Sequence, residues 1–264
     1  MSFFSANAIT AGYGKHPVVE SVSFEMEPGC VMGVLGANGS GKTTLLKALC
    51  GILPHKGRCI LDGHTLETLS ARQTAQLCSY IPQRSGISID ISALDVVLMG
   101  FNPHMKLLAH PTQAMRAAAM LALEQAGLSG MEQMNYLHMS EGQKQLCILA
   151  RTLVSESRLL LLDEPESALD FRFRHHMLDM VCTWTRSSQR SALITLHDPM
   201  LALNSCDRLL LLAHGKNAGM ITPREDSLKD MEEKLYEIYG TVSLHLCKNH
   251  SGQTSIVMLK EEDA

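Results

Sequence analysis

Long apolar runs, paired cysteines and an excess of positive charge are all missing from this 264-residue sequence. No apolar stretch approaches the ~20 residues that span a bilayer, and the opening MSFFSANAIT lacks the basic and apolar parts of a secretion signal. The net charge of −4 at pH 7 provides no electrostatic attraction to nucleic acid. We therefore expect no nucleic-acid partner, and contact with a membrane only through another protein.

The eight cysteines form no C-x-x-C pair and no repeating frame. Several of them lie inside apolar runs, such as Cys30 in CVMGVL and Cys147 in QLCILA. Cysteines in this setting are typically buried, reduced thiols of a cytosolic protein, so we expect no disulfide framework.

Strand-like and helix-like segments alternate along most of the chain, and 45% apolar residues suffice for an ordinary core. Near the N-terminus, the β-like runs ANAIT and SVSFEME flank the turn-rich AGYGKHP. The predicted strands that follow are CVMGVL, RCILDG, CSYIP, SRLLLLDEP, SALITLHD and DRLLLLAHG. The predicted helices are KTTLLKALC, closed by Gly51, then SARQTAQL and the segments 170–188 and 199–205.

Alternating strands and helices indicate an α/β fold around a mainly parallel sheet. Residues 85–157 differ because helical patterns dominate there. They include ISALDVVLMG, a segment from Pro111 to about Gly127, and a helix opened by Ser140. We interpret this region as a helical insertion in the α/β core.

The segment GANGSGKT, residues 36–43, matches the pattern G-x-x-x-x-G-K-[ST] in full. Its glycines let the backbone approach phosphate oxygens closely: Gly36, Gly39 and Gly41. Lys42 supplies a positive charge for the β- and γ-phosphates, and the Thr43 hydroxyl suits Mg²⁺. A strand before the segment and a helix after it favour a phosphate site over a merely flexible turn.

Polar residues end two of the apolar strands, where sites in parallel sheets lie. Asp163 follows LLLL and is placed to hold Mg²⁺, and Glu164 is placed to polarise an attacking water. His197 directly follows SALITL and should emerge at the same edge of the sheet. Gln83, after CSYIP, has an amide that can touch metal or water.

The stretch MSEGQKQ carries no obvious catalyst, yet Ser140 and Gln143 have the spacing of a helix capping box. A helix start also offers unpaired N–H groups to an anion, at about 0.3–1 kcal/mol. That is too little to hold a ligand alone, so such a group would add to a site that is already formed. A plain cap and an anion site share one geometry, and both interpretations stand.

In this order the motifs resemble those of the nucleotide-binding subunit of an ABC transporter: GANGSGKTT, IPQ, MSEGQKQ, LLLLDEP, SALD and TLHD. The resemblance covers essentially the whole chain, as a single ABC ATPase domain over residues 1–264. It implies a P-loop NTPase core with an N-terminal antiparallel β subdomain and an inserted α-helical subdomain at about 85–157. It further implies ATP and Mg²⁺ as cofactors and ATP hydrolysis as the reaction.

The resemblance also implies a role for individual residues. Tyr13 would stack on adenine, and the rest of the nucleotide set would be the loop residues Gly36, Asn38, Gly39, Ser40, Gly41, Lys42, Thr43 and Thr44. Ser140, Gly142 and Gln143 would face the γ-phosphate of ATP bound to another copy, with Asp170 across the subunit boundary. The catalytic set would be Glu164, His197, Gln83 and Lys42, and the metal set Thr43, Gln83 and Asp163.

Two positions depart from the family's usual pattern. Glu141 stands where the signature L-S-G-G-Q has its first glycine, and an acid near phosphate is expected to slow turnover. Glu166 stands where the family often has Thr, and we expect it to face solvent with a modest effect.

The segment LMGFNPH, residues 98–104, resembles a stretch of importers of metal chelates, namely ferric siderophores, haem and cobalamin. The tail EIYGTVSLHL is similar to the ending of the same group. The resemblance implies a homodimer at the cytoplasmic face of the membrane that drives a separate polytopic permease, with a substrate-binding protein acting indirectly. The alternatives are an importer of another nutrient and a soluble ATP-switch protein outside transport.

Overall fold

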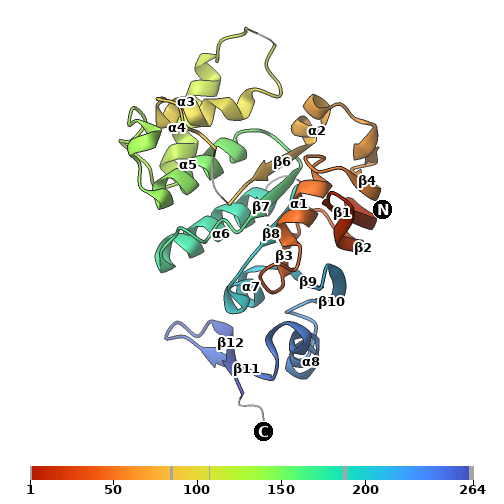
Figure 1. Cartoon of the computed structure of the whole chain (residues 1–264). Helices are drawn as coiled ribbons and strands as arrows, with labels where there is room; N and C mark the ends of the chain where they lie inside the picture. The colour runs from red at the N-terminus through yellow and green to blue at the C-terminus, as the bar shows by residue number, and fades with distance from the viewer. Residues whose placement is uncertain (1, 84–85, 107, 187–188, 262–264) are drawn as a thin grey trace.

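The computed structural model describes residues 2–83, 86–106, 108–186 and 189–261. A six-stranded sheet lies at its centre, in the order β10-β9-β3-β8-β7-β6 (Figure 1). Its neighbouring strands are parallel except for the antiparallel pair β9 and β10. The strands are β3 (Val31–Leu35), β6 (Cys78–Ile81), β7 (Leu159–Asp163), β8 (Ser191–Thr195), β9 (Arg208–Ala213) and β10 (Lys216–Ile221).

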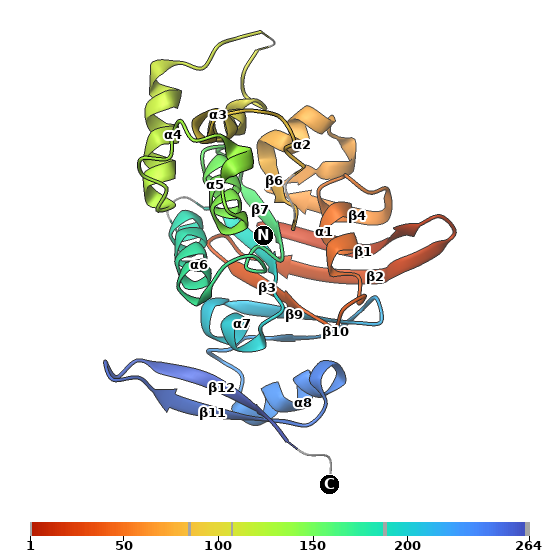
Figure 2. The ribbon, with the colours of Figure 1, turned by 60° about the vertical axis from the view of Figure 1, so that its left-hand side comes forward.

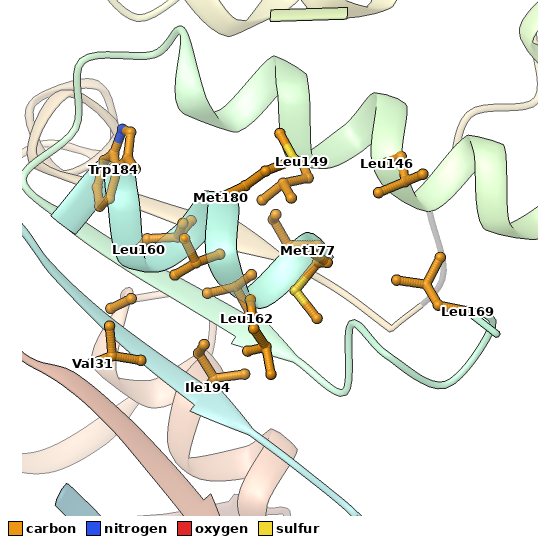
Figure 3. Packing of buried hydrophobic residues seen from close by; sticks show 14 of the residues in the cluster. Val31, Leu146, Leu149, Leu160, Leu162, Leu169, Met177, Met180, Trp184 and Ile194 are labelled. Atoms are coloured by element: carbon orange, nitrogen blue, oxygen red, sulfur yellow. The ribbon is translucent and has the colours of Figure 1, made fainter. Parts of the chain in front are cut away.

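The strands β3, β7 and β8 are buried along their whole length and largely apolar because both faces of this sheet are covered. Leu160 and Leu162 of β7 point into one core, whereas Leu159 and Leu161 point into another, as the two-residue period of a strand requires. The first core includes α5 (Glu141–Leu153) and α6 (Phe171–Arg186), whose side chains pack onto the sheet in Figure 3. The second core contains α1 (Lys42–Leu49), so α1 and α5 lie on opposite faces.

An antiparallel sheet, in the order β2-β1-β4-β5, packs over α1 in the second core. It consists of β1 (Phe4–Tyr13), β2 (His16–Met26), β4 (His55–Leu61) and β5 (His64–Thr65). The predicted break at AGYGKHP is wrong for all but two of its residues, since only Gly14 and Lys15 form the turn. Gly14 has φ 69°, and Pro17 is tolerated because β2 is an edge strand.

Helices dominate between β6 and β7, as the sequence predicted (Figure 2). Residue 85, where the predicted insertion begins, lies outside the described residues. So do residues 187 and 188, the last two of the predicted helix 170–188. The remaining helical elements in and around this region are α2 (Ala71–Leu77), α3 (Ala93–Leu98) and α4 (Gln113–Gln125), with the short turns η1 (Leu66–Thr68), η2 (Met99–Phe101) and η3 (Tyr136–His138).

The C-terminal elements were not predicted. After α7 (Pro199–Ser205) and the strands β9 and β10 come α8 (Leu228–Tyr239) and a hairpin of β11 (Val242–Lys248) with β12 (Thr254–Lys260). Figures 1 and 2 show this unit beside β9 and β10, remote from α3, α4 and α5. Among the described residues, no helix combines the length and the apolar character needed to cross a membrane.

Candidate nucleotide site

The phosphate loop connects β3 to α1 with a tightly folded backbone. A side chain at Gly36 would place its Cβ 2.3 Å from the carbonyl oxygen of Leu212, so only glycine fits there. Gly41 has φ 101°, and a Cβ there would lie 2.6 Å from Val19 of β2. The loop therefore keeps its shape through packing against both sheets before any ligand arrives.

Two buried polar groups of this loop face inward. The Lys42 ammonium donates to the carbonyl oxygens of Gly36 at 2.8 Å and Ala37 at 3.3 Å. Burial lowers the pKa of Lys42, while the carboxylates of Glu164 and Asp163 oppose that shift. The buried Ser40 hydroxyl has no hydrogen-bond partner among the described residues, which is costly unless a ligand supplies one.

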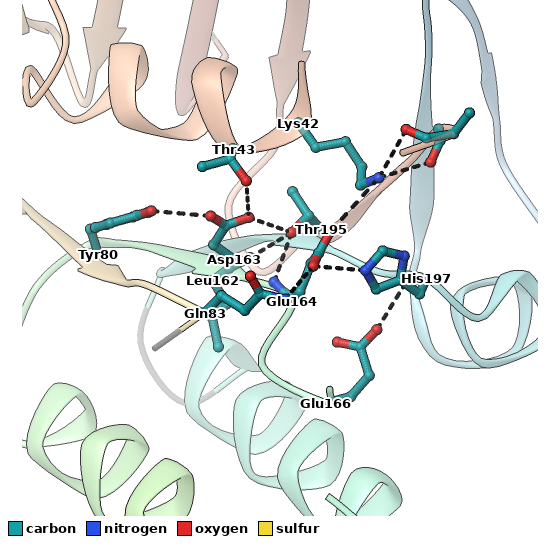
Figure 4. A network of polar contacts seen from close by, with 12 residues as sticks. Lys42, Thr43, Tyr80, Gln83, Leu162, Asp163, Glu164, Glu166, Thr195 and His197 are labelled. Atoms are coloured by element: carbon teal, nitrogen blue, oxygen red, sulfur yellow. Dashed lines mark hydrogen bonds and ion pairs between the residues drawn. The ribbon is translucent and has the colours of Figure 1, made fainter. Parts of the chain in front are cut away.

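Asp163 ends β7 and is held on both carboxylate oxygens (Figure 4). Its Oδ1 accepts hydrogen bonds from the hydroxyls of Thr43 and Thr195, each at 3.0 Å. Its Oδ2 accepts from the Tyr80 hydroxyl at 3.2 Å. Burial and the Asp163 carboxylate raise the pKa of Tyr80, which keeps the phenol a donor.

Glu164 is the centre of a second set of contacts. Its Oε2 accepts from the Gln83 amide at 2.8 Å and lies 2.7 Å from Nε2 of His197. Its Oε1 lies 3.8 Å from the Lys42 ammonium. Glu164 has φ 49°, a strained value for a residue with a side chain, and strain of this kind accumulates at functional sites.

These contacts bring together the residues predicted at the strand ends, from β7, β8, the segment after β6 and the start of α1. Two further members of this site, Thr195 and Tyr80, were not predicted from the sequence. Both belong to buried strands that look apolar in the sequence. The available signal was a hydroxyl close to a predicted site residue: Thr195 lies two residues before His197, and Tyr80 lies three residues before Gln83.

The expectation that Glu166 faces solvent is wrong. Glu166 is only 2% exposed, and its Oε1 accepts a hydrogen bond from the backbone N–H of His197 at 2.9 Å. Position 166 lies in the turn after β7, and its bond to the N–H of His197 places the side chain against the segment that follows β8. Burial raises the pKa of Glu166, although the bond from His197 opposes this shift, and its Oε2 has no partner among the described residues.

The stretch from Met139 to Gln145 begins α5 as the capping-box pattern predicted. The Ser140 hydroxyl accepts from the backbone N–H of Gln143 at 3.2 Å, and the Gln143 side chain accepts from the N–H of Ser140 at 2.9 Å. Ser140 is exposed, and Glu141 is paired with Lys144 at 2.8 Å rather than lying free.

Asp170 lies with this helix start. A pocket of about 470 Å³ is lined by residues of both segments, including Ser140, Gly142, Gln143 and Asp170. A Cβ at Gly142 would lie 3.3 Å from the carbonyl oxygen of Ala168, so the segment before Asp170 packs directly on the first turn of α5.

Three further predicted residues surround the phosphate loop. Tyr13 is 57% exposed at the end of β1, which leaves its ring free to stack on a ligand. Asn38 is exposed at the tip of the loop, and Thr44 is buried in the first turn of α1.

Comparison with known proteins agrees with this geometry. The family model for ABC transporters matches residues 19–167, which is more than half of the chain. The hemin import ATP-binding protein HmuV of Bordetella pertussis is 36% identical over 91% of this chain and 94% of that protein. The uncharacterized ABC transporter ATP-binding protein YvrA of Bacillus subtilis is 32% identical over 98% of this chain and 58% of that protein.

Solved structures give the same result. A structure described as an inward-facing conformation of an ABC transporter of metal-chelate type superposes with a TM-score of 0.81, at 26% identity and 99% coverage of both chains. The dimeric ATP-binding cassette MJ0796, bound to ADP and Pi, has the same fold, with a TM-score of 0.76, 19% identity, and coverage of 84% of this chain and 100% of that chain.

The chain therefore belongs to the ABC transporter family. Within that family it is an ATP-binding subunit that hydrolyses ATP. The predicted α/β fold class is confirmed.

Proposed function

We propose that this subunit powers the import of a metal chelate, namely haem, a ferric siderophore or cobalamin, through a separate membrane permease. The names of its relatives support this cargo class, because HmuV is a hemin import protein and the matching structure is of metal-chelate type. The segment LMGFNPH adds support from the sequence. The observation that carries the ATPase assignment is the convergence of Lys42, Asp163, Glu164 and His197 at one edge of the sheet.

The phosphate loop would bind the triphosphate. The unpartnered Ser40 hydroxyl and the inward-facing Lys42 fit an anion, which would take over the contacts that Lys42 now makes with loop carbonyls. Tyr13 would stack on the base, with Gly36, Asn38, Gly39, Gly41 and Thr44 forming the rest of the binding surface.

The oxygen atoms of Thr43, Asp163 and Gln83 fit Mg²⁺, which prefers hard oxygen ligands and usually keeps several waters. When bound there, the metal would neutralise charge on the β- and γ-phosphates. Tyr80 and Thr195 would hold the Asp163 carboxylate in place by their hydrogen bonds.

Glu164 would orient and polarise the attacking water. The three groups around its carboxylate fix the direction of both oxygens: Gln83, His197 and Lys42. His197 would also stabilise charge that develops on the γ-phosphate.

The site would be completed by a second copy of the chain in a homodimer. Ser140, Gly142 and Gln143 would contribute the helix start of α5, and Asp170 would lie at the boundary between the copies. The attraction of a helix start for an anion is only about 0.3–1 kcal/mol, rising to ~2 when partly buried. It therefore suits a group that closes a site already filled by the phosphate loop.

The remaining partners follow from this assignment. The helical subdomain at about 85–157 would dock a polytopic permease at the cytoplasmic face of the membrane, and a substrate-binding protein would deliver the chelate. Magnesium ATP would be the working cofactor, and no nucleic acid would take part.

Transport in proteoliposomes tests the proposal. The subunit, its cognate permease and its binding protein would be combined, and ATP-dependent uptake of haem, a ferric siderophore, cobalamin and an amino acid compared. We expect uptake of one metal chelate, abolished when Lys42→Met removes the phosphate charge. Uptake of the amino acid alone would show an importer for another nutrient. ATPase activity stimulated by ribosomes or DNA, without transport, would show a soluble switch protein.

A further inference from the structure

Outside the nucleotide site, three side chains of different chemistry converge on the antiparallel sheet. His55 and Cys59 lie four residues apart on β4, which places them on the same side of the strand, and Glu67 follows in η1. The His55 Nε2 atom lies 3.0 Å from Oε1 of Glu67 and 4.0 Å from Sγ of Cys59. All three potential ligand atoms lie within 4.8 Å of one another.

We propose that His55, Cys59 and Glu67 form a binding site for a divalent transition-metal ion, with Zn²⁺ as the best fit. An imidazole nitrogen, a thiolate sulfur and a carboxylate oxygen are the three ligand types that Zn²⁺ takes. Tetrahedral Zn²⁺ holds such atoms about 3.3–3.8 Å apart. The two measured separations lie on either side of this range, so small side-chain rotations complete the geometry.

The site has an open fourth position. A pocket of about 650 Å³ reaches His55 and Glu67 and is also lined by two other cysteines, Cys50 and Cys78. It provides a path for the ion and room for a water ligand, while the Cys59 side chain closes the inner side.

The surroundings act on two of the ligands in opposite directions: they favour the ionised form of Glu67 and the protonated form of Cys59. Burial alone would raise the pKa of Glu67. Hydrogen bonds from His55 and from the backbone N–H of Cys59 outweigh this effect and lower the pKa, which keeps the carboxylate ionised. Burial and Glu67 raise the pKa of the Cys59 thiol. Binding therefore displaces a proton: Zn²⁺ and the Cys59 S–H give a Zn–S bond, and H⁺ leaves to solvent.

The competing explanation is a structural contact in which His55 and Glu67 merely tie η1 to β4. The two explanations differ in what the full-length protein does with a metal ion when nucleotide is absent. Co²⁺ is a suitable probe because tetrahedral Co²⁺ bound to a thiolate absorbs strongly in the near ultraviolet. The nucleotide site has no thiol among its predicted metal ligands, so Co²⁺ held there would lack this absorption.

Chelator-treated wild-type protein titrated with Co²⁺ should show the thiolate absorption with one ion per chain, and Zn²⁺ should displace it. Cys59→Ser should lose the absorption, and His55→Gln should weaken binding at least tenfold. Cys247→Ser, which removes an exposed cysteine elsewhere, should behave as wild type. Retained ATP binding would show that each variant is folded. If Cys59→Ser does not fold, Glu67→Gln serves instead and should also weaken binding.

Two results would overturn the site. One is wild-type protein that binds Co²⁺ without thiolate absorption, or not at all. The other is absorption that persists in folded Cys59→Ser.

Discussion

Two regions of the molecule differ in how far their polar side chains are buried and bonded. The first is the phosphate loop together with the strand ends that face it, and the second is the first turn of α5. In the first region, Lys42, Asp163 and Glu164 are largely buried and hydrogen-bonded or ion-paired within the chain. In the second, Ser140 is exposed, and its side chain is used only to cap its own helix. The two helices that carry these regions lie on opposite faces of the six-stranded sheet.

We infer from this contrast that the two regions take different parts in the proposed site. Buried, mutually bonded groups are preorganised and need no outside help to keep their positions. The exposed first turn of α5, by contrast, can act only on a ligand that another copy of the chain presents to it. Variants that disturb one region and spare the other therefore test the division directly.

The largest expected effect comes from Glu164→Gln, which keeps the shape of the side chain and removes its basicity. We expect turnover to fall by roughly 10²–10⁴-fold, as for the loss of a general base. ATP binding should stay within a fewfold of wild type, because the phosphate loop is intact. Steady-state ATPase rates and nucleotide titration measure the two quantities. Glu156→Gln, a change at an exposed carboxylate, is the control, and equal rates in both variants would remove Glu164 from the mechanism.

Next in size is Ser140→Asp, which preserves the helix cap and places a negative charge where phosphate should arrive. Turnover should fall roughly tenfold or more, because about 1–2 kcal/mol of attraction becomes repulsion. Ser140→Asn also keeps the cap but adds no charge, so it should retain most of the activity. Thermal unfolding should be alike in all three proteins, and a parallel loss in both variants would point to a structural cap only.

Dimers that combine two different variants can show which copy of the chain supplies Ser140 to each ATP site. Alone, Lys42→Met should be nearly inactive, and Ser140→Asp should keep roughly a tenth of wild-type turnover or less. If every site combines the loop of one copy with the helix start of the other, a mixed dimer retains one intact site. Half of the dimers are mixed, so roughly a quarter of wild-type activity should return in a two-fold symmetric assembly. No recovery, despite proven exchange of subunits, would place both halves of a site in one chain.

A smaller effect is expected at Glu141, where the signature departs from its usual glycine. The carboxylate is paired with Lys144 and is largely exposed, and surface pairs of this kind contribute about 0.2–1 kcal/mol. Glu141→Gln should therefore change turnover by no more than about fivefold, in the direction of faster hydrolysis. The difference should shrink as salt is added, because ions screen exposed charges. A tenfold change would mean that Glu141 faces phosphate directly.

The sequence predicted that the strand-end residues meet at one edge, and the reason is physical. Runs such as LLLLD and SALIT are typical of buried strands, and a polar residue at the end of a buried parallel strand emerges at the shared edge. The Gly-rich loop and the capping box are likewise local patterns, read within eight residues or fewer. Each depends on the backbone near it rather than on distant contacts.

The predictions failed where a residue's environment comes from elsewhere in the chain. Position 166 is in a turn, which usually faces water, and its partner His197 lies 31 residues further along the chain. The trio on β4 and η1 was missed because its spacing of four and eight residues matches no familiar metal pattern. Thr195 looks like any strand threonine until Asp163 is placed beside it.

The smallest effect concerns Glu166, the least expected member of the buried region. Its pKa in the folded protein lies above the ordinary 4.5, so folding favours the protonated acid. Stability from this group is fully present below about pH 4.5 and is lost as the pH rises through the raised value. Neighbouring groups act on this pKa in both directions, since Glu164 raises it and His197 lowers it.

Glu166→Gln cannot ionise, so its unfolding temperature should rise relative to wild type as the pH increases from about 4 to 8. Asp226→Asn is a control with the opposite shift. The hydrogen bond from Lys234 lowers the pKa of Asp226 from its ordinary 3.8, so the stability from this group is already present above about pH 4. The difference between this variant and wild type should therefore stay nearly constant from about pH 4 to 8 and shrink only at more acidic pH. Thermal melts across this range measure both differences. A difference for Glu166→Gln that does not change with pH would mean that this carboxyl ionises as freely in the fold as in the unfolded chain. The buried region would then tolerate charge as readily as the exposed start of α5, and the contrast between the two regions would be weaker than their geometry indicates.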